Sequence, residues 1–255
     1  MERGAARRAR QPRLHDRRRR AEGATAIKPL QVVALGDLAA YVEFSRTLDL
    51  EVNAMVQRLA TAVHALGRPE VRDIVPALGG LALHFDPAFE GNAQELAAAL
   101  VGACLEAGLP KGTDVLRTVE VPVCYAPEFG MDLNEVSEKT KLPIQEIVDR
   151  HAAGTYRVLM IGFAPGHAYM GGLDPALAVP RRATPRIVVP AGSVAIAGEQ
   201  AVVYPYAISG GWNVIGRTPL TVFDAGRQEP SLFATGDRVK FRPVERDEFL
   251  RLEKR

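Results

Sequence analysis

Four arginines in the C-terminal half of the sequence could bind an anion. A guanidinium group offers planar, two-point hydrogen bonding to a carboxylate or a phosphate, which a lysine cannot copy. The competing explanation is that these side chains pair with carboxylates on the surface of the protein itself. We assign ligand binding to Arg186 and Arg217 ahead of the adjacent pair Arg181 and Arg182.

Three titratable residues in the same region are candidates for acid-base chemistry. His151 and His167 are histidines, which titrate near neutral pH, and Asp174 could orient an imidazole ring. A lone histidine is more often a structural residue, so both explanations stay open. Ser193 lacks a GxSxG context and Cys124 lies in an apolar strand pattern, so neither is predicted to be a nucleophile.

Other residues of this region are predicted to shape a substrate pocket. Backbone N–H groups at Gly210 and Gly211 can come close to a ligand, and turns of this kind bind anions, although they also simply make tight turns. Tyr204 and Trp212 could line the pocket, but packing against the fold explains both as well. Gln200 completes the predicted set. No GxxxxGK[ST] run occurs, so we expect no independent nucleotide site on this chain.

The N-terminal part of the chain is predicted to form a small α+β unit. Residues 30–44 indicate two strands, apolar spacing of three and four residues indicates a helix over 50–66, two strands follow at 71–75 and 81–85, and a second helix covers 93–107. This order suits two helices on one face of an antiparallel sheet, in a ferredoxin-like arrangement once a strand is contributed from elsewhere. A run rich in glycine and proline at 108–113 marks a domain boundary.

The C-terminal part has the spacing of an all-β domain. A strand at 119–125 and two short helices at 134–141 and 143–151 come first. Short apolar runs separated by glycine and proline then predict strands at 156–163, 187–189, 194–197, 201–204, 214–216, 221–223 and 239–241. Many short strands with irregular turns argue for a barrel, because closure removes exposed strand edges.

Composition narrows the class of protein. The chain has 255 residues, 47% of them hydrophobic and 24% charged, as in soluble globular proteins, and no apolar stretch of 18 residues that would span a membrane. Its two cysteines, Cys104 and Cys124, are spaced for neither a disulfide framework nor a zinc site. We therefore expect a cytoplasmic protein without a metal site.

The net charge of +2 is uneven along the chain. Residues 1–27 carry nine arginines against three acidic residues, so the rest of the chain has a net charge of about −4. We expect this N-terminal stretch to be a disordered basic tail or to result from a start codon placed too early, since runs of like charge repel and cannot bury a core. The acidic remainder gives no reason to expect a nucleic-acid partner.

Several motifs in order resemble a known family. They are GDLAAYVEF (36–44), VEVPVCY (119–125), EFGMDLNEVSEKTKL (128–142), RHAAGTYRVLMIGF (150–163), GFAPGHAYMGGLD (162–174), PRRATPR (180–186), VPAGSVAIAGEQ (189–200) and GGWNVIGRTPLTVFD (210–224). This series resembles the family of the 5-oxoprolinase B subunit, also described as allophanate hydrolase subunit 1. The resemblance covers about 28–243, the span of the family carboxyltransferase domain.

The resemblance implies a fold, a reaction and partners. The implied fold is a ferredoxin-like domain, here over 28–112, followed by a cyclophilin-like β-barrel over 113–245. The implied reaction is ATP-dependent opening of 5-oxoproline to glutamate by a three-component complex. The other two components are a homologous C subunit, which is allophanate hydrolase subunit 2-like, and a separate A subunit. ATP would be used by the complex and not bound by this chain alone, which we expect to be inactive by itself.

Three departures from the family pattern bear on the substrate. His167 stands where the resemblance predicts a phenylalanine, Glu199 where it predicts a glycine, and Ala207-Ile208-Ser209 where a Glu-Ser-Pro-like run is common. Because these positions border the predicted pocket, they leave the choice among small amides and carboxylates open.

Two other functions fit the same family. One is the carboxyltransferase half of a biotin-dependent urea or amide carboxylase, for which the biotin would come on another chain because no MKM-like acceptor occurs here. The other is a binding protein that inhibits a histidine kinase through its barrel. Prolyl isomerase activity would be an analogy from the fold alone.

Overall fold

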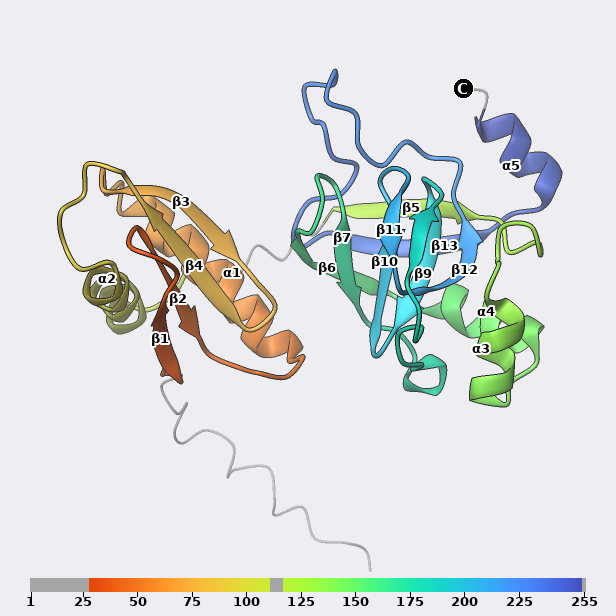
Figure 1. The fold of residues 1–255 in the computed structure, drawn as a ribbon, viewed down its shortest axis with the longest axis horizontal. Helices are drawn as coiled ribbons and strands as arrows, with labels where there is room; N and C mark the ends of the chain where they lie inside the picture. Colours follow the sequence, from red (N-terminus) through yellow and green to blue (C-terminus); the bar gives the residue numbers. More distant parts are fainter. Residues whose placement is uncertain (1–27, 111–116, 254–255) are drawn as a thin grey trace, which may run out of the picture.

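The computed structural model describes residues 28–110 and 117–253. Its elements form an N-terminal unit, residues 28–110, and a barrel unit, residues 117–253 (Figure 1). The predicted basic tail and residues 111–113 of the predicted boundary at 108–113 lie outside the described residues. Within the described ranges, no helix is long and apolar enough to cross a membrane.

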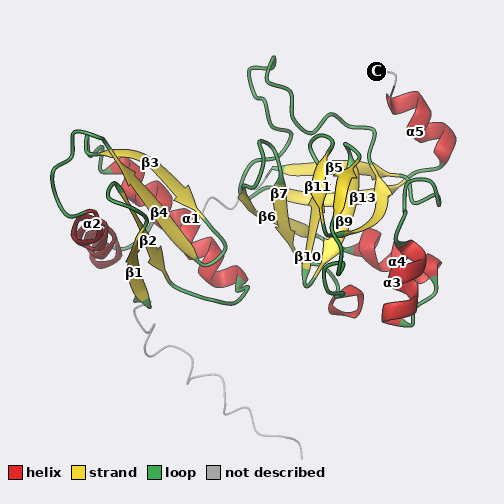
Figure 2. Ribbon diagram, in the orientation of Figure 1, coloured by secondary structure: helices red, strands yellow, loops and turns green. Residues whose placement is uncertain are grey.

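The N-terminal unit is a four-stranded antiparallel sheet in the order β1-β2-β4-β3 with two helices packed on it (Figure 2). Its elements match the predicted ones closely: β1 Gln31–Ala34, β2 Ala39–Glu43, α1 Leu50–Ala65, β3 Val71–Pro76, β4 Gly80–Phe85 and α2 Ala93–Ala107. Apolar side chains of both helices and of the central strands β2 and β4 form one core. The ferredoxin-like name for this unit stays a prediction.

The two helices begin where side chains satisfy their first N–H groups. Asp49 accepts hydrogen bonds from the backbone N–H groups of Glu51 and Val52, at 2.8 and 3.0 Å. Asn92 does the same for Gln94 and Glu95. Such caps stabilise a helix by about 0.5 to 2 kcal/mol, which explains why the observed starts are sharp.

The barrel unit contains a seven-stranded, nearly closed barrel-like sheet in the order β12-β9-β10-β7-β6-β13-β5. The strands are β5 Thr118–Val123, β6 Tyr156–Ile161, β7 Ala168–Gly171, β9 Ser193–Ala197, β10 Gln200–Val203, β12 Asn213–Arg217 and β13 Arg238–Pro243. The two ends of the sheet meet through backbone hydrogen bonds between Cys124 and Arg217, at 2.9 and 3.0 Å. This contact confirms the predicted tendency to remove strand edges.

Alternate residues of the barrel strands belong to two different hydrophobic clusters. On β9, Val194 and Ile196 lie in the barrel core, whereas Ala195 and Ala197 lie in a separate cluster with Tyr204 and Trp212. Successive side chains of a strand point to opposite faces, so the second cluster lies on the outside of the barrel. A two-stranded sheet, β8 Arg186–Val189 and β11 Ile208–Gly210, contributes Val189 and Ile208 to this outer cluster.

Helices complete the barrel unit. They are α3 Leu133–Thr140, α4 Ile144–Ala153, the one-turn η1 Pro175–Leu177, and α5 Arg246–Glu253. The sequence patterns predicted α3 and α4 but not α5, β7 or β11. The strand predicted at 221–223 is wrong, because only an isolated bridge from Phe223 to Ser231 forms there.

Side-chain hydrogen bonds join the two units. Asn53 and Gln57 on α1 donate to the backbone oxygen of Leu159 on β6, at 3.1 and 3.0 Å. Asn53 is buried and also donates to Ala77 and Leu78. One amide group therefore ties a strand of the barrel to a turn of the N-terminal unit.

Candidate functional site

A cleft of about 240 Å³ lies where β11 and the loops before β8 and β12 meet the outer face of the barrel. It is lined by aromatic, cationic and small polar residues: Phe163, His167, Tyr169, Arg181, Arg182, Pro185, Tyr204, Ser209, Gly210, Gly211 and Trp212. All come from the region whose residue types suggested chemistry in the sequence.

Aromatic side chains make the walls of this cleft. Tyr204 and Trp212 are almost fully buried, and the ring of Tyr169 meets that of Trp212 edge to face at 5.9 Å between centroids. Gly210 lies directly against Tyr204, since a Cβ at this position would come within 2.1 Å of the Tyr204 hydroxyl. The backbone at Gly210 therefore lies close to a tyrosine, whereas its predicted approach to a ligand stays a prediction.

His167 is a buried, neutral group in the cleft. It is 2% exposed, and its ring packs against those of Tyr169, Tyr204 and Phe163. Burial lowers the pKa of His167 to about 4, so the ring carries no charge at neutral pH. Its Nδ1 atom is buried without a hydrogen-bond partner among the described residues.

Phe163 at the cleft mouth has an unusual backbone. Its φ angle is +72°, in the left-handed region that non-glycine residues rarely adopt, and its side chain is 65% exposed. Such a conformation costs on the order of 1 to 3 kcal/mol and occurs most often at functional sites. An exposed aromatic ring held at this cost makes Phe163 a candidate functional residue of the cleft.

Two of the candidate arginines are held by one buried carboxylate. Asp132, which is 2% exposed, accepts two hydrogen bonds from Arg186, at 2.6 and 2.7 Å, and one from Arg182 at 2.6 Å. It also accepts from the backbone N–H of Val214 at 2.7 Å. Arg186 is thus engaged by the protein itself, which is the competing explanation raised for it from the sequence.

Arg181 differs from its neighbour. Its guanidinium carbon lies 5.6 Å from the centre of the Trp212 ring, a cation–π arrangement. Among the residues the structure describes, no carboxylate oxygen lies within ion-pairing distance of it. The arginine ranked behind Arg186 from the sequence is therefore the one that remains available to an anion.

The structure brings together five of the predicted site residues and separates the others. His167, Tyr204, Gly210, Gly211 and Trp212 line the cleft. Arg186 does not line it, but shares Asp132 with Arg182, which does. The remaining predicted residues, which are His151, Asp174, Arg217 and Gln200, do not line it.

His151 and Asp174 have structural partners instead. His151 is fully buried on α4, its Nδ1 lies 2.7 Å from the Tyr125 hydroxyl, and its ring stacks on Phe241. Asp174 accepts from the N–H of Ala176 and pairs with Arg150, at 2.9 Å each. These contacts give His151 and Asp174 roles in packing and in starting η1.

Arg217 and Gln200 also lie apart from the cleft. Arg217 donates to the backbone oxygen of Ala191 at 2.8 Å, and its guanidinium lies 5.9 Å from the ring of Phe249 on α5. Gln200 begins β10, and its Nε2 atom is buried without a partner. Neither position faces the residues that could hold a ligand in the cleft.

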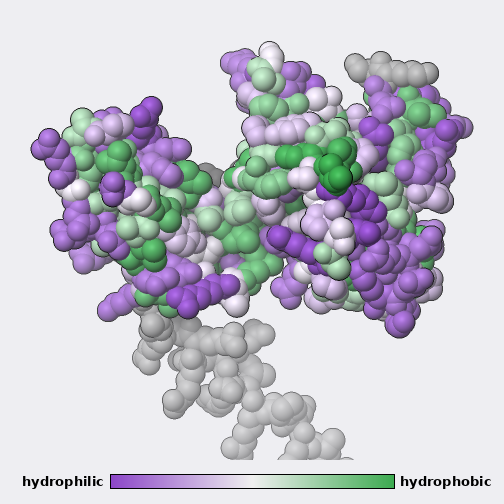
Figure 3. Space-filling model, viewed as in Figure 1, coloured by the Kyte–Doolittle hydropathy of each residue, from purple (hydrophilic) through white to green (hydrophobic). Residues whose placement is uncertain are grey.

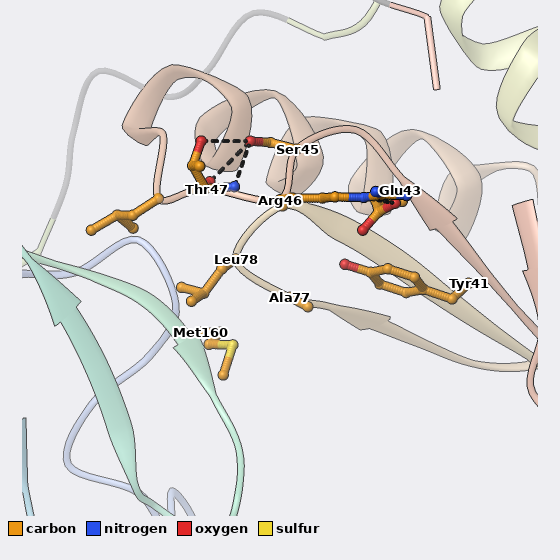
Figure 4. Close-up of a pocket in the computed structure, with 10 residues that line it drawn as sticks. Tyr41, Glu43, Ser45, Arg46, Thr47, Ala77, Leu78 and Met160 are labelled. Atoms are coloured by element: carbon orange, nitrogen blue, oxygen red, sulfur yellow. Dashed lines mark hydrogen bonds and ion pairs between the residues drawn. The ribbon is translucent and has the colours of Figure 1, made fainter. Parts of the chain in front are cut away.

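A second cavity, of about 370 Å³, lies between the units (Figure 4). Figure 4 shows Tyr41, Glu43 and Arg46 on one side and Leu78 with Met160 on the other. Its carboxylate, on Glu43, is already paired with Arg46 at 3.1 Å and accepts from Gln31 at 2.7 Å. Because its charges are satisfied, we place the site in the cleft.

Sequence patterns missed two residues that line the cleft and one that holds its Arg182 side chain. Phe163, Tyr169 and Asp132 were not singled out, although the glycine before Phe163 and the two after Met170 are a local signal of tight backbone. Asp132 carries no such signal, since it reaches Arg186 across 54 residues. No group of three or more His, Cys, Asp or Glu side chains in the described ranges could hold a metal ion.

Replacing His167 by phenylalanine is expected to stabilise the chain. The substitution removes a buried nitrogen that lacks a partner, a defect that costs about 1 to 3 kcal/mol, and keeps an aromatic ring in the same place. A gain of about 1 kcal/mol would raise Tm by about 2 to 4 °C, measured by thermal unfolding. His151→Phe is the matched control and should lower Tm, because it leaves the buried Tyr125 hydroxyl without its hydrogen-bond partner. A fall in Tm for His167→Phe would contradict this account.

The fold and the cleft define the class of protein by comparison with known families. Residues 30–233 match the family described as carboxyltransferase domain, subdomain C and D, and the chain belongs to this family. It is 36% identical over 224 residues to the B subunit of 5-oxoprolinase from Bacillus subtilis, an alignment that covers 83% of this chain and 91% of that protein.

Two solved structures resemble this protein. TTHA0988 is 36% identical with a TM-score of 0.70, over 81% of this chain. The urea carboxylase of Kluyveromyces lactis is 19% identical with a TM-score of 0.73, over 88% of this chain, and shows likeness of fold alone. This chain spans only 40% of the first protein and 22% of the second, so in both cases the matching part belongs to a longer polypeptide.

Proposed function

We propose that this chain is the B subunit of an ATP-dependent 5-oxoprolinase complex, acting in the cytoplasm with two partners, a homologous C subunit and a separate A subunit. The observation that carries the proposal is the alignment with the Bacillus subtilis protein of that name, which extends over nine tenths of that protein. The likeness to urea carboxylase is too distant in sequence to favour the carboxylase alternative.

The chemistry of the cleft suits a small lactam. Ring opening breaks the amide C–N bond, with water supplying oxygen to the carbonyl carbon and hydrogen to the nitrogen. An amide resists water at neutral pH, and ATP can activate it through a phosphorylated intermediate. We assign this chain the binding of the lactam in the cleft and assign ATP to the assembled complex, because no Walker-type motif is present.

An apolar strand beside the cleft supports the proposal of a homologous partner. On β8, Ile187 is 89% exposed and Val188 is 59% exposed. Consecutive strand residues point to opposite faces, so both faces of β8 are open at these two positions, although Val189 at its end is buried in the outer cluster. In the described ranges β11 is its one strand neighbour. Figure 3 shows hydrophobic side chains gathered where β11 lies, bordered by hydrophilic ones. We assign this surface to the homologous C subunit.

Ile187→Asp is expected to weaken assembly strongly. A charge at the centre of a docking surface should raise the Kd of the complex by at least about 30-fold, as at interface hot spots where truncation costs about 2 kcal/mol or more. Size-exclusion chromatography with light scattering on the copurified subunits measures the effect. Leu35→Asp, at an exposed position of the N-terminal unit, is the matched control. Equal assembly of both variants would move the interface elsewhere.

The experiment that tests the function is an omission assay. The three subunits are purified, mixed with ATP and 5-oxoproline, and glutamate is measured with each one left out in turn. We expect release only from the full set, and none from this chain alone. Release that does not depend on this chain would reject the proposal.

We also infer the finer fold names. A ferredoxin-like domain over about 28–112 is supported by the antiparallel order β1-β2-β4-β3 with two helices. A cyclophilin-like barrel over about 113–245 is supported by the nearly closed sheet.

A further inference from the structure

The cleft presents a single uncompensated charge. Its lining contains Arg181 and Arg182 and no acidic side chain. Arg182 is neutralised by Asp132 and Glu135, whereas Arg181 has no such partner in the part of the chain that the structure describes. A positive group without a counter-charge, at the edge of an aromatic pocket, attracts an anion.

Arg181 is exposed but is not free to take any position. Its guanidinium lies over the ring of Trp212, which is 6% exposed and packs against Tyr169. A guanidinium held over an aromatic ring has less freedom of position, so it loses less conformational entropy when it binds a carboxylate. The donors are therefore preorganised at the cleft mouth.

His167 adds a polar contact without adding charge. It is neutral at pH 7 and lines the cleft. A neutral imidazole can donate to a carbonyl or accept from an amide N–H, depending on its tautomer. The cleft thus combines one positive charge with one neutral hydrogen-bonding group between flat aromatic walls.

We propose that the cleft binds a small ring-shaped monoanion and that Arg181 is the residue that pairs with its carboxylate. The ring lies among the aromatic walls, and its polar edge faces His167. The cleft volume, about 240 Å³, is below the roughly 300 to 1,000 Å³ of pockets that hold drug-sized ligands, so the ligand is small. Naming the ring as a lactam rests on the proposed function. The negative charge and the small size of the ligand are inferred from the cleft itself.

The test is direct binding to the full chain, measured by calorimetry with two probes. One probe is 5-oxoproline, and the other is 2-pyrrolidinone, the same lactam without a carboxylate. We expect the wild type to bind 5-oxoproline at least 10-fold more tightly. Arg181→Gln should lower that affinity by about 10-fold to 100-fold, as for loss of a hydrogen bond to a charged group, and leave 2-pyrrolidinone unchanged. Arg251→Gln, on the exposed face of α5, is the control.

The outcomes separate this inference from the proposed function. Unchanged affinity in Arg181→Gln, equal binding of the two probes, or no binding to either the chain or the assembled complex would overturn the inference. Turnover of 5-oxoproline with the same KM in wild-type and Arg181→Gln complexes would reject Arg181 while the proposed function stands. Charge-selective binding that depends on Arg181, without turnover, would uphold the inference and reject the function.

Discussion

Asp132→Asn is expected to destabilise the chain by about 3 to 5 kcal/mol, the range for removing one partner of a buried ion pair. The carboxylate of Asp132 is 2% exposed and accepts hydrogen bonds from Arg182, Arg186 and the backbone of Val214. An asparagine has the same shape but presents an NH₂ group to guanidinium donors. In thermal unfolding, this loss corresponds to a fall in Tm of about 6 to 20 °C.

Glu135→Gln is the control for this experiment. Glu135 also pairs with Arg182, but its side chain is 39% exposed and its charge is screened by water. We expect its loss to change stability by less than about 1 kcal/mol. If Asp132→Asn lowered stability no more than Glu135→Gln, the buried carboxylate would not be the group that holds Arg182 and Arg186 in place.

Acid should destabilise the chain between pH 7 and pH 5. Burial lowers the pKa of His151 to about 3 and that of His167 to about 4, from an ordinary value of 6.5. Below pH 6.5 the unfolded chain binds protons that the folded chain does not, so stability present above pH 6.5 is lost as pH falls towards these two values. At pH 5 the loss is about 2 kcal/mol for each histidine, or about 4 kcal/mol together.

Urea unfolding at pH 7 and pH 5 measures this loss. His167→Phe is the informative variant, because it removes one of the two titrating groups. It should halve the loss in free energy of unfolding between pH 7 and pH 5. A pH dependence that His167→Phe leaves unchanged would show that His167 is not buried and neutral as described.

Periodicity predicted the N-terminal unit well for a physical reason. Its helices and strands are amphipathic against one core, so apolar spacing in the sequence directly reports burial: the helix expected over 93–107 is α2, Ala93–Ala107. Local spacing also placed most barrel strands. It missed β7 Ala168–Gly171, because this strand contains a glycine and follows a run, GFAPG, that signals only a turn.

The site was harder to predict, because roles of charged residues depend on partners distant in sequence. Nothing near Arg186 reveals that Asp132 occupies it, and nothing near Arg181 reveals that it has no such partner in the described ranges. His151 shows the same limit: it lies within one of the family motifs, yet it is fully buried on α4 and its ring contacts those of Tyr156 and Phe241. Residue type and spacing found the region of the cleft, and tertiary contacts decided which side chains face it.

The most direct test of the central claim is a comparison of substrates on the assembled complex. This chain and its copurified partners are incubated with ATP and either 5-oxoproline or urea, the latter with bicarbonate and a biotinylated carrier, and product and ADP are measured together. The account predicts glutamate from 5-oxoproline with matching ADP release, and no reaction of urea. ATP-dependent consumption of urea, or a stable complex that leaves 5-oxoproline unchanged, would contradict it.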